Sequence, residues 1–154
     1  MKIIDFIEEF KKSTSKEALL REHIKSYYMS WMMKVAEAEN IIQKSCYVDD
    51  NFRLNSPLRY YLYMIVIVRN YTDLEFDDEE AVRDFNSLEE AGISDMLVSL
   101  IGEDVEKFNT VLKMTLDDHM ENYRSFAGYI DNKSSALMEV LEGLDLGDTD
   151  AQSQ

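Results

Sequence analysis

Apolar residues recur every three or four positions along most of the chain, which is the spacing of the buried face of an amphipathic helix. This spacing predicts a short first helix over residues 3–10 and a long second run over residues 19–42. The second run fits one long helix, or two helices with a bend near Ser30. Thr14 and Glu17 have the three-residue spacing of a capping box, so Thr14 is predicted to cap the start of this run.

The helical spacing fails between residues 46 and 55, where the sequence reads CYVDDNFRLN. Apolar and aromatic residues flank Asp49, Asp50 and Asn51, three residues of types that favour turns. A small β-hairpin and an irregular loop both fit this segment.

A helix is predicted to begin at Ser56 and Pro57, because serine is a favoured N-cap and proline suits the first helical position. Residues 57–71 are apolar nearly all round, as expected of a buried central helix. The β-branched residues Ile65 and Val66 would also suit a strand, but the length of the run and its Ser-Pro start favour a helix.

Four further helices are predicted in the second half of the chain, over residues 78–91, 95–101, 103–124 and 126–144. Gly92, Gly102 and Ser125 mark the boundaries between them, because glycine commonly ends a helix and serine commonly caps the start of one. The polar end of the chain, DLGDTDAQSQ, has the composition of a disordered tail.

The chain is predicted to be all-α, or nearly so. It has 154 residues, one Pro and five Gly, and 45% of its residues are hydrophobic. This composition suits a compact multi-helix bundle with a central apolar helix and room for one small β-hairpin near residues 46–55. We expect a single helical domain over residues 1–144 and a disordered acidic tail over residues 145–154.

The formal net charge of −15 is unevenly distributed along the chain. Residues 1–77 hold 11 Lys or Arg and 12 Asp or Glu, whereas residues 78–154 hold 5 and 19. Such a field repels nucleic acids and anionic membranes, and it attracts basic surfaces. We therefore expect a basic protein surface as the partner, and neither direct nucleic-acid binding nor membrane binding.

The acidic residues from Asp77 onward are densely grouped, which costs stability through repulsion unless a basic partner relieves it. They predict an acidic partner-binding face made of Asp77, Asp78, Glu79, Glu80, Asp84, Glu103, Asp104, Glu106, Asp117, Asp118 and Glu121. His23, Tyr27, Tyr28 and Trp31 form an aromatic stripe that is more typical of a core than of a cofactor site. If part of this stripe is exposed, it would be a second partner-binding site, because Tyr and Trp dominate such sites.

No catalytic motif is present, and we expect neither an enzyme nor a bound cofactor or metal. The carboxylates beside His119 could hold a metal only with a second group of ligands elsewhere in the fold. Acidic residues alternate over residues 73–79 as in a calcium loop, but Asp78 stands where that loop requires glycine. Cys46, the only cysteine, is expected to be a buried apolar residue.

Two stretches of the sequence resemble small acidic helical proteins encoded by phages and prophages of Firmicutes. The first spans residues 55–75, NSPLRYYLY running into NYTDLE, and the second spans residues 108–123, which begin FNTVLKMTLDDHMEN. The resemblance covers residues 1–142. It implies the host bacterial cytoplasm or a virion as the setting, and it supplies no catalytic motif.

Two functions fit these observations. The first is a non-catalytic phage protein whose acidic face docks a basic partner, such as an anti-defence (for example anti-CRISPR) inhibitor that occupies the nucleic-acid-binding channel of a host protein. The alternative is a virion or assembly accessory protein, either a head or tail component or an assembly chaperone. The charge of the second half favours the inhibitor, and a homo-oligomer is compatible with both.

Overall fold

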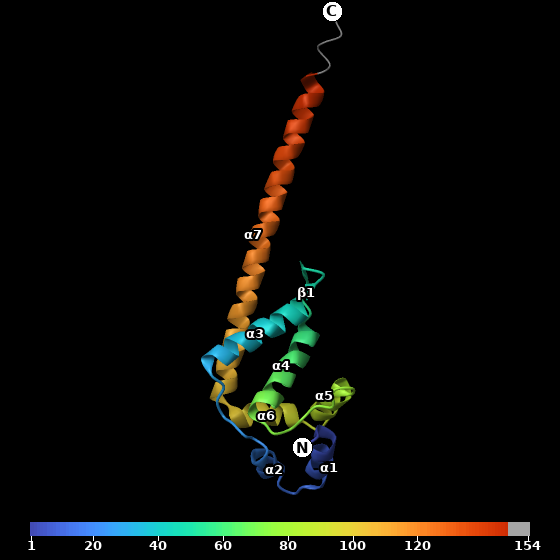
Figure 1. Cartoon of the computed structure of the whole chain (residues 1–154), viewed down its shortest axis with the longest axis vertical. Coiled ribbons are helices and arrows are strands. Elements are labelled where there is room, and N and C mark those ends of the chain that lie inside the picture. The colour runs from blue at the N-terminus through green and yellow to red at the C-terminus, as the bar shows by residue number, and fades with distance from the viewer. Residues whose placement is uncertain (148–154) are drawn as a thin grey trace, which may run out of the picture. The chain divides into compact units, whose positions relative to one another are not determined.

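The computed structural model describes the backbone of residues 1–147 and the side chains of residues 1–141 (Figure 1). In this part of the chain, seven helices and one two-stranded hairpin confirm the predicted, nearly all-α fold. The helices are α1 (Ile3–Lys12), α2 (Lys16–Glu22), α3 (Trp31–Cys46), α4 (Ser56–Tyr71), α5 (Ala81–Glu90), α6 (Ile93–Ile101) and α7 (Glu103–Gly147). The strands are β1 (Tyr47–Val48) and β2 (Asn51–Phe52).

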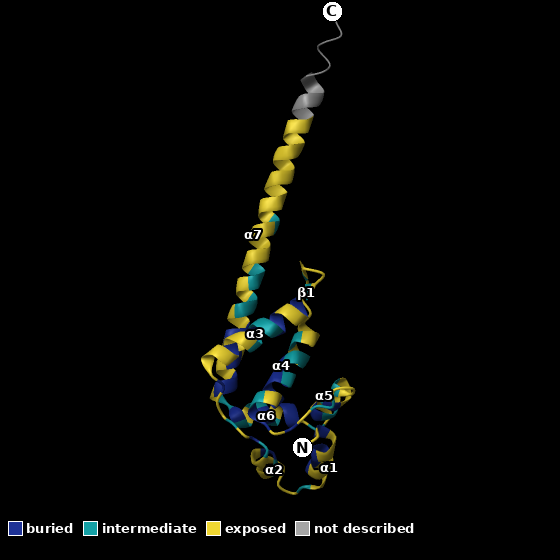
Figure 2. Ribbon diagram, in the orientation of Figure 1, coloured by how far each residue is buried: buried dark blue, intermediate teal, exposed yellow. Residues whose placement is uncertain are grey.

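The chain divides into two compact units, Met1–Leu116 and Asp117–Gln154. The first unit holds the hydrophobic core, where buried side chains of α1, α3, α4 and α6 are joined by those of the first turns of α7 (Figure 2). The second unit contains the rest of α7, and most of its described side chains are exposed. Of the predicted tail over residues 145–154, the first three residues end α7 and residues 148–154 lie outside the described part of the chain.

The apolar run over residues 19–42 is divided between two helices, as one of the two alternatives predicted. α2 ends at Glu22, and α3 begins at Trp31. The Ser30 hydroxyl accepts a hydrogen bond from the Met33 amide at 3.2 Å and so caps α3. The predicted bend at Ser30 is therefore a helix start, preceded by a non-helical connection.

The predicted capping box at Thr14 is not formed. Ser15 occupies the N-cap position of α2, and no side chain makes a capping hydrogen bond there. The Ser15 amide donates instead to the Ser13 hydroxyl at 3.1 Å. The turn before α2 is therefore closed by a local serine contact rather than by a cap.

α4 is the central apolar helix, as predicted. It packs along α3, and its Met64 and Tyr71 side chains have no exposed surface. Asn55, not Ser56, is the N-cap of this helix, because the Asn55 side-chain oxygen accepts a hydrogen bond from the Leu58 amide at 3.0 Å. Both residue types can cap, and the structure places Ser56 inside the helix.

The segment between α3 and α4 is a hairpin, which settles the choice between hairpin and loop. Tyr47 lies opposite Phe52 across the two strands, and their ring centroids are 5.4 Å apart. Asp49 and Asp50 have φ angles of 50° and 62°, in the left-handed region that a two-residue hairpin turn requires. Aspartate tolerates this region better than most residues, so the Asp-Asp pair can close the turn.

Glycines separate the last three helices, as predicted. Gly92 and Gly102 have φ angles of 67° and 68°, which few other residues adopt. α5 begins at Ala81 rather than at residue 78, because the preceding acidic residues form a turn. The Asp77 amide in this turn donates to the Asp84 carboxylate at 2.8 Å.

The predicted helix break at Ser125 is wrong. α7 runs without interruption from Glu103 to Gly147. A single serine in a helix costs only about 0.5 kcal/mol relative to alanine, and no glycine or proline adjoins Ser125 to add to that cost. The helix therefore continues through it.

The two candidate caps of α4 can be separated by substitution. Asn55→Ala is expected to lower the free energy of unfolding by about 1 kcal/mol, because it leaves the Leu58 amide without its acceptor. Ser56→Ala, the matched control, is expected to change it by less than about 0.5 kcal/mol. Urea denaturation of both variants checks this, and a larger loss for Ser56→Ala than for Asn55→Ala would contradict the assignment.

Candidate protein-binding surface

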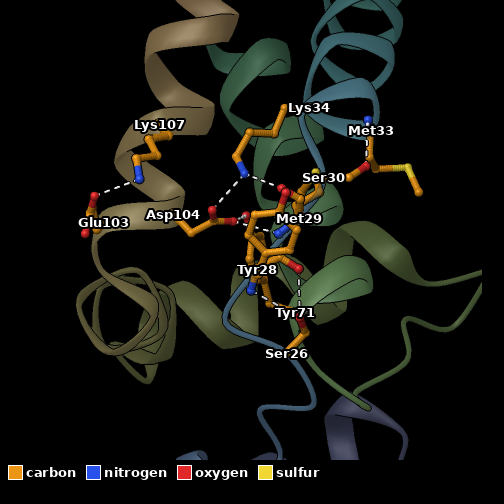
Figure 3. A network of polar contacts seen from close by, with 10 residues as sticks. All are labelled: Ser26, Tyr28, Met29, Ser30, Met33, Lys34, Tyr71, Glu103, Asp104 and Lys107. Atoms are coloured by element: carbon orange, nitrogen blue, oxygen red, sulfur yellow. Dashed lines mark hydrogen bonds and ion pairs between the residues drawn. The ribbon is translucent and has the colours of Figure 1, made fainter.

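A buried ion pair joins the start of α7 to the first turn of α3 (Figure 3). The Asp104 carboxylate lies 2.8 Å from the Lys34 ammonium, and the two residues are only 8% and 3% exposed. The second Asp104 oxygen accepts hydrogen bonds from the Tyr71 hydroxyl at 2.7 Å and from the Met29 amide at 2.8 Å. The Lys34 ammonium also donates to the Met29 carbonyl. Both charges are thus paired and hydrogen-bonded, which is the condition for burying them.

The local sequence brings these groups together. Ser30 caps α3 and places Lys34 one turn into that helix, on its buried face. Gly102, with its positive φ, ends α6 and leads into α7, whose second residue is Asp104. Tyr71 is the last residue of α4. Three helices that are distant in the sequence therefore meet at one carboxylate.

The surroundings of Asp104 hold the pKa of its carboxyl below the ordinary value. Burial alone raises this pKa, but the hydrogen bonds from Lys34, Tyr71 and the Met29 amide, together with the charge of Lys34, outweigh that effect. Burial raises the pKa of the Tyr71 hydroxyl, and the bond to Asp104 raises it further. Asp104 is therefore ionised and Tyr71 is neutral at neutral pH.

Aromatic and sulfur-containing side chains are exposed around the first turn of α3. We call this region the aromatic surface, and it comprises Tyr27, Tyr28, Trp31, Met32 and Met33. Tyr28, Trp31 and Met32 are 68%, 59% and 77% exposed. The expectation of a core position is wrong for Tyr27, Tyr28 and Trp31. The chain leaves the helical conformation between α2 and α3, so helical spacing no longer sets which way these side chains face.

The aromatic surface is supported by the buried ion pair. The Lys34 ammonium lies 5.1 Å from the centre of the Tyr28 ring, which is a cation–π contact. A cavity of about 150 Å³ opens beside this ring, and its lining consists of Tyr28, Met29, Trp31, Lys34, Asp104 and Lys107. Exposed rings beside a cavity that is lined by a buried ion pair are suited to binding a side chain of a partner protein.

Two residues of the predicted acidic face are buried. Asp104 is the centre of the network above, and Asp84 is almost fully buried beneath the turn before α5. One Asp84 oxygen accepts the Asp77 amide, and the other lies 3.5 Å from the Arg83 guanidinium. Neither carboxylate is available to a partner, so both are removed from the predicted face.

Within the first unit, the remaining predicted acidic residues do not gather on one face. Asp78, Glu79 and Glu106 are exposed. Three others lie beside basic side chains, in the pairs Asp77–Lys2 (3.9 Å), Glu80–Arg83 and Glu103–Lys107 (2.7 Å). The turn before α5 and the start of α7 lie on opposite sides of the first unit (Figure 1). Asp117, Asp118 and Glu121 belong to the second unit.

The other candidates for chemistry are the possible metal sites and Cys46. No group of three or more His, Cys, Asp or Glu side chains among the described residues is arranged to hold a metal ion. Asp73, from the calcium-loop segment, lies 2.7 Å from Nδ1 of His23. Cys46 is fully buried, as predicted. Within residues 1–147, no helix has the length and apolar character needed to cross a membrane.

Lys34 and Tyr71 were not predicted as partners of Asp104, although the sequence carries a signal for the Lys34–Asp104 pair. Lys34 precedes Ala38 by four residues and so falls on the apolar stripe of its helix. Asp104 precedes Phe108 by four residues and falls on the stripe of α7. Opposite charges on two buried stripes indicate a buried pair.

The chain matches no protein-family model, no curated protein and no solved structure. The resemblance to phage proteins of Firmicutes therefore stays a prediction. What the site does has to be inferred from its own geometry.

Removing the central carboxylate is expected to destabilise the first unit strongly. Asp104→Ala should lower the free energy of unfolding by about 3–5 kcal/mol, because it leaves the buried Lys34 ammonium without its counterion. Glu103→Ala, at the adjacent exposed position, should leave stability nearly unchanged. Urea denaturation followed by circular dichroism checks both variants, and equal losses would contradict the role given to Asp104.

The same network predicts a dependence on acid. A carboxyl whose pKa is lower in the folded than in the unfolded state stabilises the fold above its unfolded pKa of about 3.9, and this contribution is lost as the pH falls through the folded value. The stability difference between the wild type and Asp104→Asn is therefore expected to be constant from neutral pH to mildly acidic pH and to shrink below about pH 4. Urea denaturation at a series of pH values measures this difference. A difference that grows on acidification would contradict the lowered pKa of Asp104.

Proposed function

We propose that the protein is non-catalytic and acts by binding a partner protein through the aromatic surface. The observation that supports this is the exposure of Tyr28, Trp31 and Met32 above a rigid, buried ion pair. Tyrosine and tryptophan supply most of the binding energy in many protein interfaces, and methionine adapts to varied partners. Covering exposed apolar side chains with a partner removes apolar surface from water, which contributes favourable binding free energy.

We infer that the partner is basic. A net charge of −15 attracts a cationic protein over distances longer than any single contact and speeds the encounter. In this proposal, charge steers the partner and the aromatic surface holds it. A phage-encoded inhibitor of a host nucleic-acid-binding protein, acting in the host bacterial cytoplasm, has these properties.

One observation favours the alternative of a virion or assembly component. Large apolar side chains are exposed along α7 in the second unit, and such side chains are common in assembly interfaces. Mass spectrometry of purified particles separates the alternatives, since only a virion component is present in a fixed ratio to the capsid protein.

The aromatic surface can be tested with a matched pair of variants. Trp31→Ala is expected to weaken partner binding by about 30-fold, the effect of an interface residue worth 2 kcal/mol. Val82→Ala on α5 removes another exposed apolar side chain and serves as the control. Both variants are compared with the wild type by affinity capture from host lysate, followed by surface plasmon resonance with the captured protein.

The kinetic measurements also test the division of roles. If charge steers and aromatic contacts hold, added salt lowers the association rate and Trp31→Ala raises the dissociation rate. Equal binding by Trp31→Ala and the wild type would overturn the aromatic surface as the site. An association rate that does not change with salt would overturn the basic partner.

A further inference from the structure

The second unit presents a helix that buries little of its own surface. From Glu121 to Leu141, every side chain is exposed except that of Ala127, which is half-buried. Leu137 is 66% exposed. The stretch also contains poor helix formers, among them Gly128 and Asn132. A helix with such residues is marginal in water unless its apolar face is packed against something.

One stripe of side chains on this helix follows a seven-residue repeat, and the exposed apolar side chains of Phe126, Tyr129, Met138 and Val140 lie outside it. Tyr123, Ile130 and Leu137 are seven residues apart. A second set with the same repeat consists of Met120, Ala127, Ser134 and Leu141, of which Ser134 is polar. Steps from one set to the other alternate between three and four residues. A period of 3.5 residues keeps the stripe facing one partner only when two helices supercoil around each other. The repeat therefore favours another helix as the covering element.

The sizes of the side chains in the repeat favour a second copy in the antiparallel direction. Parallel copies would place Ala127 against Ala127 and Ser134 against Ser134, so that small layers alternate with crowded ones. In antiparallel copies the two sets face each other. Aligning Ala127 with Ile130 of the second copy also aligns Ser134 with Tyr123, and every small side chain then meets a large one.

The charges beside the stripe agree with the same register. Arg124 and Asp131 each follow a residue of the first set, and antiparallel coiled coils bring these flanking positions face to face. The register places Arg124 opposite Asp131 of the second copy, twice by symmetry. In a parallel pair, neither Arg124 nor Asp131 would face a residue of the other charge.

The acidic start of the unit also favours this direction. Asp117, Asp118 and Glu121 lie within two turns. Parallel copies would bring two such groups together at one end, and like charges at that distance repel. Antiparallel copies place them at opposite ends.

We propose that residues 117–141 of two copies of this chain form an antiparallel coiled coil centred between Ala127 and Ile130. The dimer carries two first units, and hence two aromatic surfaces. If the proposed function holds, a partner with repeated sites is bound more tightly by the dimer than by a single chain. The dimer itself does not depend on that function.

The oligomeric state of the full chain tests the proposal. Sedimentation equilibrium is expected to show a dimer for the wild type. Ile130→Asp, which buries a charge at the centre of the coil, is expected to weaken dimerisation by at least about 100-fold. Tyr129→Asp, at the neighbouring exposed position outside the stripe, should leave the dimer intact. Circular dichroism of the first unit's unfolding transition confirms that both variants remain folded.

A charge exchange tests the direction. Arg124→Glu and Asp131→Arg should each weaken the dimer, and the double variant should restore it, because each new charge again meets its opposite. A monomeric wild type, including one whose helix is covered by a different protein, overturns the proposal. So does a dimer that survives Ile130→Asp. A dimer that the double variant does not restore overturns the antiparallel register. Trp31→Ala should leave the dimer unchanged, so failure of the binding function and failure of the dimer are separable.

Discussion

The Lys34–Asp104 pair is the interaction on which the arrangement of the first unit depends. Two opposite charges are paired in the interior. The Asp104 carboxylate also accepts hydrogen bonds from the Tyr71 hydroxyl and from the Met29 amide. Such a pair adds little net stability compared with apolar residues of the same shape, but losing one partner is costly. Its main effect is therefore on specificity, since α3, α4 and α7 can satisfy one carboxylate in only one relative position.

This specificity bears on how the molecule can bind. The aromatic surface lies on a connection and a first helical turn, which are places where chains are usually mobile. Here the connection is held through the Met29 backbone, and the Tyr28 ring lies against the Lys34 ammonium. A surface ordered before binding loses less conformational entropy when it is covered. In the proposed function, the buried ion pair therefore favours affinity by ordering the aromatic surface.

Much of the fold could be predicted from the sequence, and the misses have physical causes. Hydrophobic spacing and glycines locate most helices because those signals are local. The predicted break at Ser125 is wrong because serine favours a helix start but costs little inside a helix, so the helix continues. The exposure of Trp31 could not be read from spacing, since spacing assigns a direction only while the chain stays helical. The burial of Asp104 depends on Lys34 and Tyr71 in other helices, whereas Asp84 has partners close in the sequence. Net charge says nothing about either.

The contrast between buried Met29 and its exposed neighbours could be used in protein engineering. Met29 is buried and bonded through its backbone, whereas the side chains of Trp31 and Met32 are mostly exposed. Tyr28 contacts the Lys34 ammonium, so folding places few demands only on the identity of Trp31 and Met32. Combinatorial libraries could randomise them, with Ser30 and Lys34 kept, and yield new recognition specificities on an unchanged scaffold. Under natural selection the same positions would be free to drift as a target changed.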